Sequence, residues 1–169
     1  MIETESLILD KAKFSDWKEM YYNVWSQPES AKYMSWSITT NEDDAKIRMI
    51  KTIAFQKEHD TYLVYERASG KAIGFAGVEK IGPCIYQEAG ICLGPNYVRK
   101  GFGKQILRGL IQYCKKEFDA KEFIYSTREE NRASSLLAES FGFSMISSVT
   151  EIDSKDGHRY NILQYSLKL

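Results

Sequence analysis

The chain has few of the residues that crosslink small proteins. Only three of its 169 residues are cysteine, and Cys84, Cys92 and Cys114 show none of the paired spacings typical of a zinc site. We therefore expect neither a disulfide framework nor a metal site. Cys92 and Cys114 lie in apolar runs, which indicates small core residues. A chain of this length can bury a stable core without crosslinks.

An excess of charge of either sign is also missing. Lys plus Arg and Asp plus Glu both number 23, so the formal net charge is zero. No overall field attracts such a chain to nucleic acid or to an anionic membrane, so we expect neither as a partner. Any anion that it binds must be held by a local site.

Long apolar runs are absent as well. No stretch approaches the roughly 20 apolar residues of a membrane-spanning helix. The opening "MIETESLILDKAK" lacks the basic and apolar regions of a signal peptide, and we expect a cytoplasmic protein. Aromatic residues make up 13% of the chain, which argues against disorder. With no repeat, linker or low-complexity tract, residues 1–169 are expected to form a single domain.

The periodicity of apolar residues predicts strands and helices in the order β-α-α-β-β-β-α-β-α-β-β. Strands are expected at 6–13, 61–67, 72–81, 87–93, 122–127, 143–152 and 160–169, and helices between Ser15 and Pro28 and at 41–59, 103–118 and 131–141. In the helix at 41–59, an apolar stripe is expected from Ile47, Ile50, Ile53 and Ala54. The strand at 160–169 is a candidate dimer edge, so we expect a monomer or a homodimer.

The stretch "GPNYVRKGFGK" at 94–104 predicts a loop that wraps backbone N–H groups around an anion, because a long amphipathic helix follows it at once. It is not a Walker A loop, since Lys104 is followed by Gln105 and the upstream glycine position is Val98. A dinucleotide fingerprint would need a glycine where Ile106 stands. A plain strand-to-helix turn stays open, although cations at a helix start are unfavourable unless an anion binds there.

Two motifs resemble those of the GNAT acetyltransferase superfamily. "YVRKGFGKQILRGLI" is similar to its coenzyme A loop, Q/R-x-x-G-x-G/A followed by a long helix. About thirty residues on, "NRASSLLAESFGF" matches N-x-x-S with a helix and a closing Gly-Phe. With "EAGICL" before the loop, the chain is most similar to the branch of ribosomal-protein N-terminal acetyltransferases. The resemblance covers essentially the whole chain and implies an α/β (α+β) GNAT-like fold, with one central, mixed, mostly antiparallel twisted sheet flanked by helices.

The resemblance implies acetyl-CoA as co-substrate. Its pyrophosphate would accept hydrogen bonds from the loop amides, and its pantetheine arm would lie beside the preceding strand, with Asn131 as a further contact. The implied coenzyme-binding residues are Ile91, Cys92, Leu93, Arg99, Lys100, Gly101, Phe102, Gly103, Lys104 and Asn131. Side chains at 101 or 103 would block the phosphates. The chain departs from the family at Val98, the usual Gln/Arg position, and at Arg99, a usual glycine and a candidate replacement cation.

Candidates for the catalytic residues come from the second motif and from the strands. The tyrosine that protonates the leaving thiolate in much of the superfamily is replaced by Ala138, and the resemblance to the N-x-x-S branch makes Ser134 the candidate proton donor. Alternatively, Asn131 is only a helix N-cap and Ser134 a locally bonded first-turn residue. We expect Glu79 as the base, because strand alternation places it with Phe75, Gly77 and Ile81 on a mostly apolar face. Its rivals are Glu88, Glu151 and Asp153, whereas His59 and His158 are expected at the surface.

The predicted function is acetyl-CoA-dependent N-acetyl transfer to a primary amine by direct attack in a ternary complex. The amine would be a protein N-terminal α-amine or a small molecule. Deprotonation at pH 7 costs about 1 kcal/mol for an α-amine but roughly 4–5 kcal/mol for a lysine, which favours the former. Aromatic residues that could line the acceptor site, or simply pack in the core, are Trp25, Tyr33, Trp36 and Tyr62. A non-catalytic acyl-CoA sensor and, less favoured, a nucleotide-phosphate enzyme are the alternatives.

Overall fold

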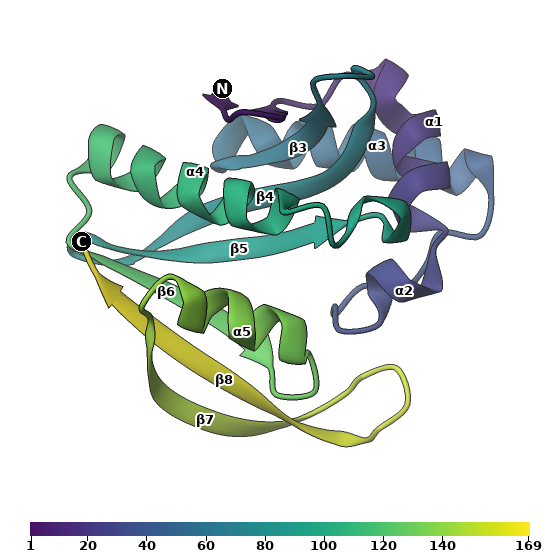
Figure 1. Cartoon of the computed structure of the whole chain (residues 1–169). Helices are drawn as coiled ribbons and strands as arrows, with labels where there is room; N and C mark the ends of the chain where they lie inside the picture. The colour runs from purple at the N-terminus through teal and green to yellow at the C-terminus, as the bar shows by residue number, and fades with distance from the viewer.

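An eight-stranded sheet organises the chain, and the computed structural model describes all of it, residues 1–169 (Figure 1). The strand order is β1-β2-β3-β4-β5-β6-β8-β7. Only β5 and β6 pair in parallel, so the predicted mixed, mostly antiparallel sheet is confirmed. The strands are β1 (Ile2–Glu3), β2 (Leu7–Asp10), β3 (Thr61–Glu66), β4 (Ala72–Gly82), β5 (Ile85–Leu93), β6 (Glu122–Arg128), β7 (Ser144–Ile152) and β8 (Arg159–Lys168).

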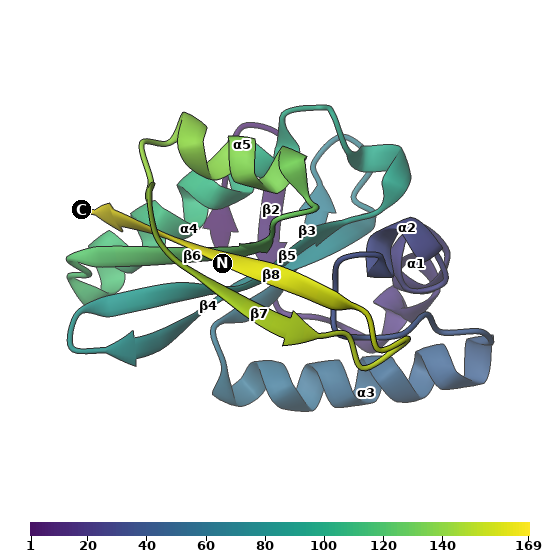
Figure 2. The same ribbon diagram turned by 90° about the horizontal axis from the view of Figure 1, so that it is seen from below.

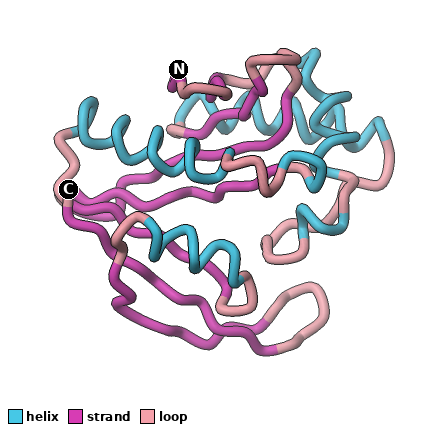
Figure 3. The backbone as a smooth tube through the Cα atoms, in the orientation of Figure 1, coloured by secondary structure: helices cyan, strands magenta, loops and turns pink.

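Helices cover both faces of this sheet. Figure 2 shows α3 on one face and α4 with α5 on the other, and Figure 3 separates helices from strands by colour. The helices are α1 (Trp17–Met20), α2 (Pro28–Ala31), α3 (Glu42–Glu58), α4 (Phe102–Phe118) and α5 (Arg132–Ser140), with 3-10 turns at Phe14–Asp16 and Pro95–Tyr97 and a π-helical turn at Tyr21–Trp25. None of them is long and apolar enough to cross a membrane.

The first predicted helix is wrong as a single element. The Asp16 carboxylate does not cap it. Instead it accepts hydrogen bonds from the Lys13 N–H at 2.8 Å and the Tyr65 hydroxyl at 2.6 Å. The π-helical turn then widens the helix so that two consecutive side chains, Val24 and Trp25, are both buried. A π-helical turn changes the number of residues per turn, so a search for a 3.6-residue period does not predict this break.

Two hydrophobic clusters lie on opposite faces of the sheet. On the α4 side, Ile106, Leu107, Leu110 and Cys114 are fully buried, which confirms the apolar face predicted for that helix. On the α3 side, the second cluster contains Met20, Val24, Trp25 and Met49. The sheet is therefore covered on both faces around β4 and β5, the strands that lead to the glycine loop.

The apolar stripe predicted on α3 is wrong except at Ile53, which packs against the second cluster. Ile47 and Ile50 are 50% and 58% exposed, whereas Ala45, Met49 and Gln56 are buried. The polar Gln56 occupies the inner face because its Oε1 accepts a hydrogen bond from the Ala12 N–H at 2.7 Å. A buried amide of this kind hides the true phase of the helix from an analysis of apolar residues.

The dimer edge predicted at 160–169 is also wrong. β8 is paired with β6 over Ile162–Lys168 and with β7 over Arg159–Ser166, so it lies inside the sheet and not at its edge. The hairpin folds back so that β7 forms the edge instead, with exposed apolar side chains at Met145, Ile146, Val149 and Ile152. The loop of this hairpin reaches across to α2, where Lys155 Nζ donates to the carbonyls of Ala31 and Met34 at 2.9 and 2.8 Å.

The two central strands separate partway along the sheet. β5 pairs with β6 over only three residue pairs, the last being Gln87 with Ile124. Beyond this point Glu88 Oε1 lies 3.4 Å from the Ser126 N–H, and Gly90 adopts a left-handed φ of 95°. The second half of β5 therefore has no strand partner on the β6 side, and its peptide groups there are free to bind a ligand.

We predict that Gly74→Ala is strongly destabilising, because the new Cβ would lie 2.2 Å from the Cys92 carbonyl oxygen of the neighbouring strand. Relief of this overlap must separate β4 from β5 and should lower the free energy of unfolding by at least about 2 kcal/mol. The matched control is Gly82→Ala in the same strand, where the nearest atom would be 3.4 Å away. Urea denaturation of both variants checks this, and equal stabilities would contradict it.

Candidate active site

The glycine loop presents a row of backbone donors with nothing in the protein to receive them. The first hydrogen bond of α4 runs from the Gln105 N–H to the Gly101 carbonyl at 3.3 Å, and the N–H groups from Arg99 to Lys104 donate to no protein acceptor. They gather at the N-terminus of a 17-residue helix, where its dipole favours negative charge. This arrangement fits a bound phosphate or pyrophosphate.

The two glycines of the loop serve different purposes. Gly101 is the N-cap of α4 and has a left-handed φ of 76°, but a Cβ added there would have no atom within 4 Å. Its requirement is therefore conformational and not spatial. Gly103 has no such φ, and a Cβ at this position would lie 3.6 Å from Leu137 Cδ2 across the cavity.

The loop forms one end of a cavity of about 780 Å³ between α5 and the segment around α2, which we term the coenzyme cavity. A cavity of this size is typical of cofactor sites. Of the residues predicted to bind the coenzyme, those that line it are Ile91, Leu93, Arg99, Gly101, Gly103, Lys104 and Asn131. The Val98 side chain lies at its rim and is 47% exposed.

Three residues predicted at the coenzyme site do not line the cavity. Cys92 is buried on the opposite side of β5, with its thiol 3.6 Å from the Ser30 carbonyl. Phe102 packs into the core beneath α4. Lys100 is drawn away, with its Nζ 5.2 Å from the centre of the Tyr97 ring. These positions can contribute backbone groups but not side chains.

The opposite wall was missed by sequence analysis. Glu29, Lys32 and Tyr33 line the coenzyme cavity from α2 and the segment after it. Because α2 has only four residues, no periodic pattern marks it in the sequence. Tyr33 was noted only as a candidate acceptor-site aromatic, yet it lies beside the predicted coenzyme residues.

Ser134 and Asn131 meet at the start of α5. The Asn131 Oδ1 accepts a hydrogen bond from the Ser134 N–H at 3.3 Å, so Asn131 is an N-cap that also lines the cavity. The Ser134 hydroxyl lies 2.7 Å from the Tyr125 hydroxyl. Ser134 is therefore not limited to local bonding within its helix turn.

Tyr125 is the functional candidate that sequence analysis did not single out. It lies on β6, is 4% exposed, and contacts the coenzyme cavity. Burial raises the pKa of its hydroxyl well above the ordinary range. The hydroxyl is therefore protonated at neutral pH and can hold a proton for Ser134. Its signal in the sequence was only one aromatic in a buried strand, which is usually a core residue.

A smaller cavity of about 140 Å³ adjoins the first, and Tyr33, Ile91, Tyr125, Asn131 and Ser134 line both. We term it the reaction cavity, because Glu88 lies at its far end.

The Glu88 carboxylate fills the place where β5 and β6 separate. It is 9% exposed and accepts hydrogen bonds from the Gly90 N–H at 2.6 Å and the Ser126 N–H at 3.4 Å. Burial, with a smaller contribution from the charge of Glu79, raises the pKa of Glu88 to about 7 despite these two donors. A carboxylate with a pKa near neutrality is suited to take up a proton.

Glu79 does not occupy the apolar environment expected for it. Ala76 pairs with Ile91 and Val78 with Glu88, so the bulge there adds a residue to β5 and the alternation along β4 is kept. Val78 is buried, but Glu79 and the two residues after it are exposed, because this end of β4 is not covered. Glu79 lines neither the coenzyme cavity nor the reaction cavity.

The other proposed carboxylates are engaged elsewhere. Glu151 is exposed and accepts a hydrogen bond from the Tyr160 hydroxyl at 3.0 Å. Asp153 is buried beside Arg128 at 2.7 Å, and the Lys155 N–H together with Arg128 lowers its pKa. His59 and His158 are both exposed, as predicted.

Comparison with known proteins agrees with this geometry. The family model described as Acetyltransferase (GNAT) domain matches residues 6–144. The chain belongs to the GNAT acetyltransferase family. This GNAT protein is therefore an acyltransferase, of a family of N-acetyltransferases that use acetyl-CoA.

Individual relatives extend over nearly the whole chain. An uncharacterized N-acetyltransferase, p20 of Bacillus licheniformis, is 25% identical over 167 residues, covering 97% of this chain and 93% of the relative. The microcin self-immunity acetyltransferase MccE, solved with acetyl-CoA and AMP, superposes with a TM-score of 0.83 at 18% identity over 98% and 94% of the two chains. The ribosomal-protein alpha-N-acetyltransferase RimL gives a TM-score of 0.80 at 18% identity over 100% and 96%. The structural likenesses confirm the predicted fold.

We predict that Glu88 makes the stability of this GNAT protein depend on pH. Its pKa is raised in the folded state, so the protonated form stabilises the fold at low pH and this contribution is lost as pH rises from about 4.5 to about 7. Between pH 5 and pH 8 the wild type should lose about 3 kcal/mol more unfolding free energy than Glu88→Gln. Urea denaturation at both pH values measures the difference. Glu79→Gln is the control, and its unfolding free energy should keep most of the pH dependence of the wild type.

Proposed function

We propose that this GNAT protein transfers the acetyl group of acetyl-CoA to a primary amine, either the N-terminal α-amine of a protein or the amine of a small molecule. The observation that carries the proposal is the row of unpaired loop N–H groups, because they face a cavity that leads directly to Ser134, Tyr125 and Glu88. Similarity to RimL and MccE supports it. The organisation as a single domain and the cytoplasmic location stay predictions.

The coenzyme would lie along the coenzyme cavity with its pyrophosphate on the glycine loop. Backbone donors from Arg99 to Lys104 bind the phosphates, and Lys104 and Lys32 add charge from opposite walls. The free peptide groups of β5 near Ile91 and Leu93 bind the amide-rich arm. Recognition through the backbone tolerates Val98 at the family's usual Gln/Arg position.

Acetyl-CoA supplies an activated acetyl group on a thioester, and the protein's residues move the protons. Glu88 accepts the proton that the amine must lose for its nitrogen to form a bond to the acetyl carbon. Ser134 gives its proton to the sulfur when the carbon–sulfur bond breaks, and Tyr125 replaces that proton across their 2.7 Å hydrogen bond. The proton taken up by Glu88 then returns to Tyr125 through the reaction cavity, which both residues line. Tyr125 thereby takes over from β6 the role that the family's tyrosine plays at position 138, where this chain has a fully buried alanine.

The pKa of Glu88 favours an α-amine as acceptor. Transfer of a proton to a carboxyl group with a pKa of about 7 costs about 1 kcal/mol from an amine with a pKa near 8, but roughly 4–5 kcal/mol from a lysine side chain near 10.4. The base is thus matched to weakly basic amines.

A non-catalytic acyl-CoA sensor is the second candidate, because Ala138 and Val98 depart from the family pattern. A sensor would bind the coenzyme without acetylating any amine and would change its affinity for a partner. The buried Glu88 and the Tyr125–Ser134 pair favour the enzyme, since neither group is needed to bind the coenzyme.

We predict that Gly103→Glu abolishes acetyl-CoA binding, because its carboxylate would enter the coenzyme cavity beside the phosphates. Gln112→Glu adds the same charge to an exposed position of the same helix and is the matched control. Isothermal calorimetry should give micromolar or tighter binding for wild type and control and none for Gly103→Glu. If the folded wild type does not bind acetyl-CoA, the loop is a plain strand-to-helix turn and not a coenzyme site. Binding without thiol release across a broad amine panel would favour the sensor.

We predict that Tyr125→Phe and Ser134→Ala each lower kcat by about 10–100-fold, as expected when a general acid is lost. Acetyl-CoA affinity should change little in either variant. The double variant should be scarcely slower than the single ones, since both residues act in one proton path. Stopped-time assays of thiol release measure these rates, and undiminished turnover in Tyr125→Phe would remove the tyrosine from the mechanism.

A further inference from the structure

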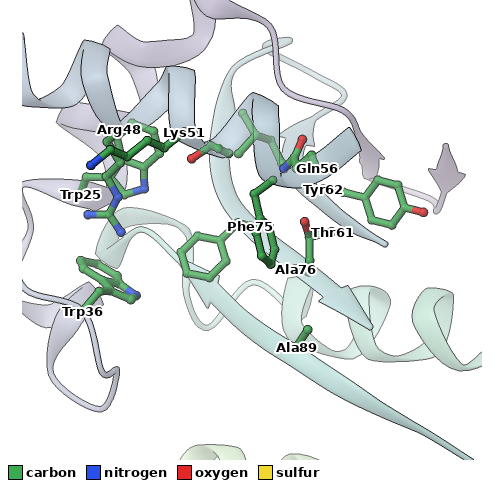
Figure 4. Close-up of a pocket in the computed structure, with 13 residues that line it drawn as sticks. Trp25, Trp36, Arg48, Lys51, Gln56, Thr61, Tyr62, Phe75, Ala76 and Ala89 are labelled. Atoms are coloured by element: carbon green, nitrogen blue, oxygen red, sulfur yellow. The ribbon is translucent and has the colours of Figure 1, made fainter. Parts of the chain in front are cut away.

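A third cavity, which we term the Arg48 cavity, has a volume of about 340 Å³ and lies on the other face of the sheet beneath α3 (Figure 4). Aromatic side chains of Trp25, Trp36 and Phe75 form much of its wall, and Arg48 and Lys51 are the only charged residues that line it. A pocket with two cations and no carboxylate has a local positive charge in a protein of zero net charge.

Arg48 is held rigidly at this cavity. Figure 4 shows its guanidinium group between the indoles of Trp25 and Trp36, whose ring centres lie 4.8 and 4.5 Å from Cζ. Its one side-chain hydrogen bond runs from Nη1 to Thr39 Oγ1 at 3.1 Å, and it forms no ion pair. Burial lowers the pKa of Arg48 to about 10, which leaves it charged at neutral pH.

Such a guanidinium group is incompletely satisfied. It has five N–H donors in a planar fork, and one of them has a side-chain acceptor. Stacking on two indoles fixes the plane of the fork while leaving its edge free for a planar or tetrahedral oxyanion. The exposed Lys51, three residues further along the same helix, adds a second positive charge at the entrance.

This cavity adjoins the reaction cavity across β5. Ala89 lines the Arg48 cavity, while its neighbours Glu88 and Gly90 line the reaction cavity. Gly90 has no side chain, and a Cβ there would lie 3.5 Å from Phe75 Cε2 in the wall of the Arg48 cavity. The two spaces therefore approach each other at Gly90, where β5 has already left β6.

We propose that the acceptor amine carries an oxyanion, a carboxylate or a phosphate, and that Arg48 binds this group while the amine reaches Glu88 past Gly90. This inference rests on the proposed acetyl transfer and narrows its substrate to anion-bearing amines. The aromatic walls hold the apolar body of the substrate between its two ends. Amines without an anion leave the Arg48 donors unpaired and bind weakly.

Matched amine pairs test the proposal and distinguish the two anions. L-Phenylalanine against phenethylamine tests a carboxylate, and tyramine O-phosphate against tyramine tests a phosphate. Thiol release with acetyl-CoA should show a kcat/KM at least about 10-fold higher for the anionic member of one pair, and that pair identifies the oxyanion. Equal or better turnover of both neutral members would overturn the proposal.

Substitution of Arg48 tests whether the preference for anionic amines depends on this residue. Arg48→Gln should raise KM for the preferred anionic amine about 10–100-fold, leaving kcat and acetyl-CoA affinity nearly unchanged. Arg108→Gln is the matched control, because Arg108 also lies over an aromatic ring, Phe141, at 5.8 Å but on the opposite face of the sheet. If Arg48→Gln fails to fold, Arg48→Lys keeps the charge without the fork and should raise KM by a smaller factor. An unchanged KM in a folded Arg48 variant would overturn the assignment.

Direct binding separates this proposal from the acetyl-transfer reaction. Quenching of tryptophan fluorescence by the same four compounds needs no turnover and reports on Trp25 and Trp36 in the cavity wall. Saturable binding of an anionic member that is lost in Arg48→Gln would support the anion site even if no amine were acetylated. Absence of any Arg48-dependent binding would overturn it even if neutral amines were acetylated.

Discussion

The early end of pairing between β5 and β6 is the constraint on which the site depends. Three parallel pairs hold the strands together, and beyond them each strand must find other partners for its peptide groups. On β5 the free groups flank the coenzyme cavity, and on β6 the Ser126 N–H turns to the Glu88 carboxylate. The same separation buries Glu88 in the interior of the sheet, which raises its pKa to about 7. The same strand separation therefore produces both the free peptide groups of β5 and the buried carboxylate of Glu88.

The sheet also divides the chemistry between its two faces. On the face of α4 and α5, the groups are backbone donors and hydroxyls, which suit a phosphate-bearing thioester. On the face of α3, they are indoles and an unpaired guanidinium group, which suit an anionic, partly apolar molecule. The two faces therefore offer different binding chemistry, and β5 with its glycine at position 90 separates the two cavities.

Much of this architecture can be predicted from the sequence, for identifiable reasons. The glycine loop and the amphipathic α4 leave local signals in the sequence. Most residues predicted to bind the coenzyme at Ile91, Leu93 and 99–104 therefore do line one cavity, and their binding of the coenzyme stays a prediction. Glu88 and Tyr125 were not chosen, because their roles depend on a strand separation and on one contact across a fold, to Ser134. Glu79 lies in an exposed end of β4, and the buried Gln56 occupies part of the inner face of α3. Local periodicity predicts neither how far a sheet is covered nor which amide is buried.

The tie from Lys155 to the carbonyls of Ala31 and Met34 joins two segments more than 120 residues apart. Between these two carbonyls lies Tyr33, which belongs to the wall shared by the coenzyme and reaction cavities. The hairpin turn at 154–158 therefore holds the segment that carries Tyr33 against the two cavities. A change in the length of this turn would shift the wall of both cavities without substituting any residue that lines them, so the shape of the site can vary while its reactive groups stay the same.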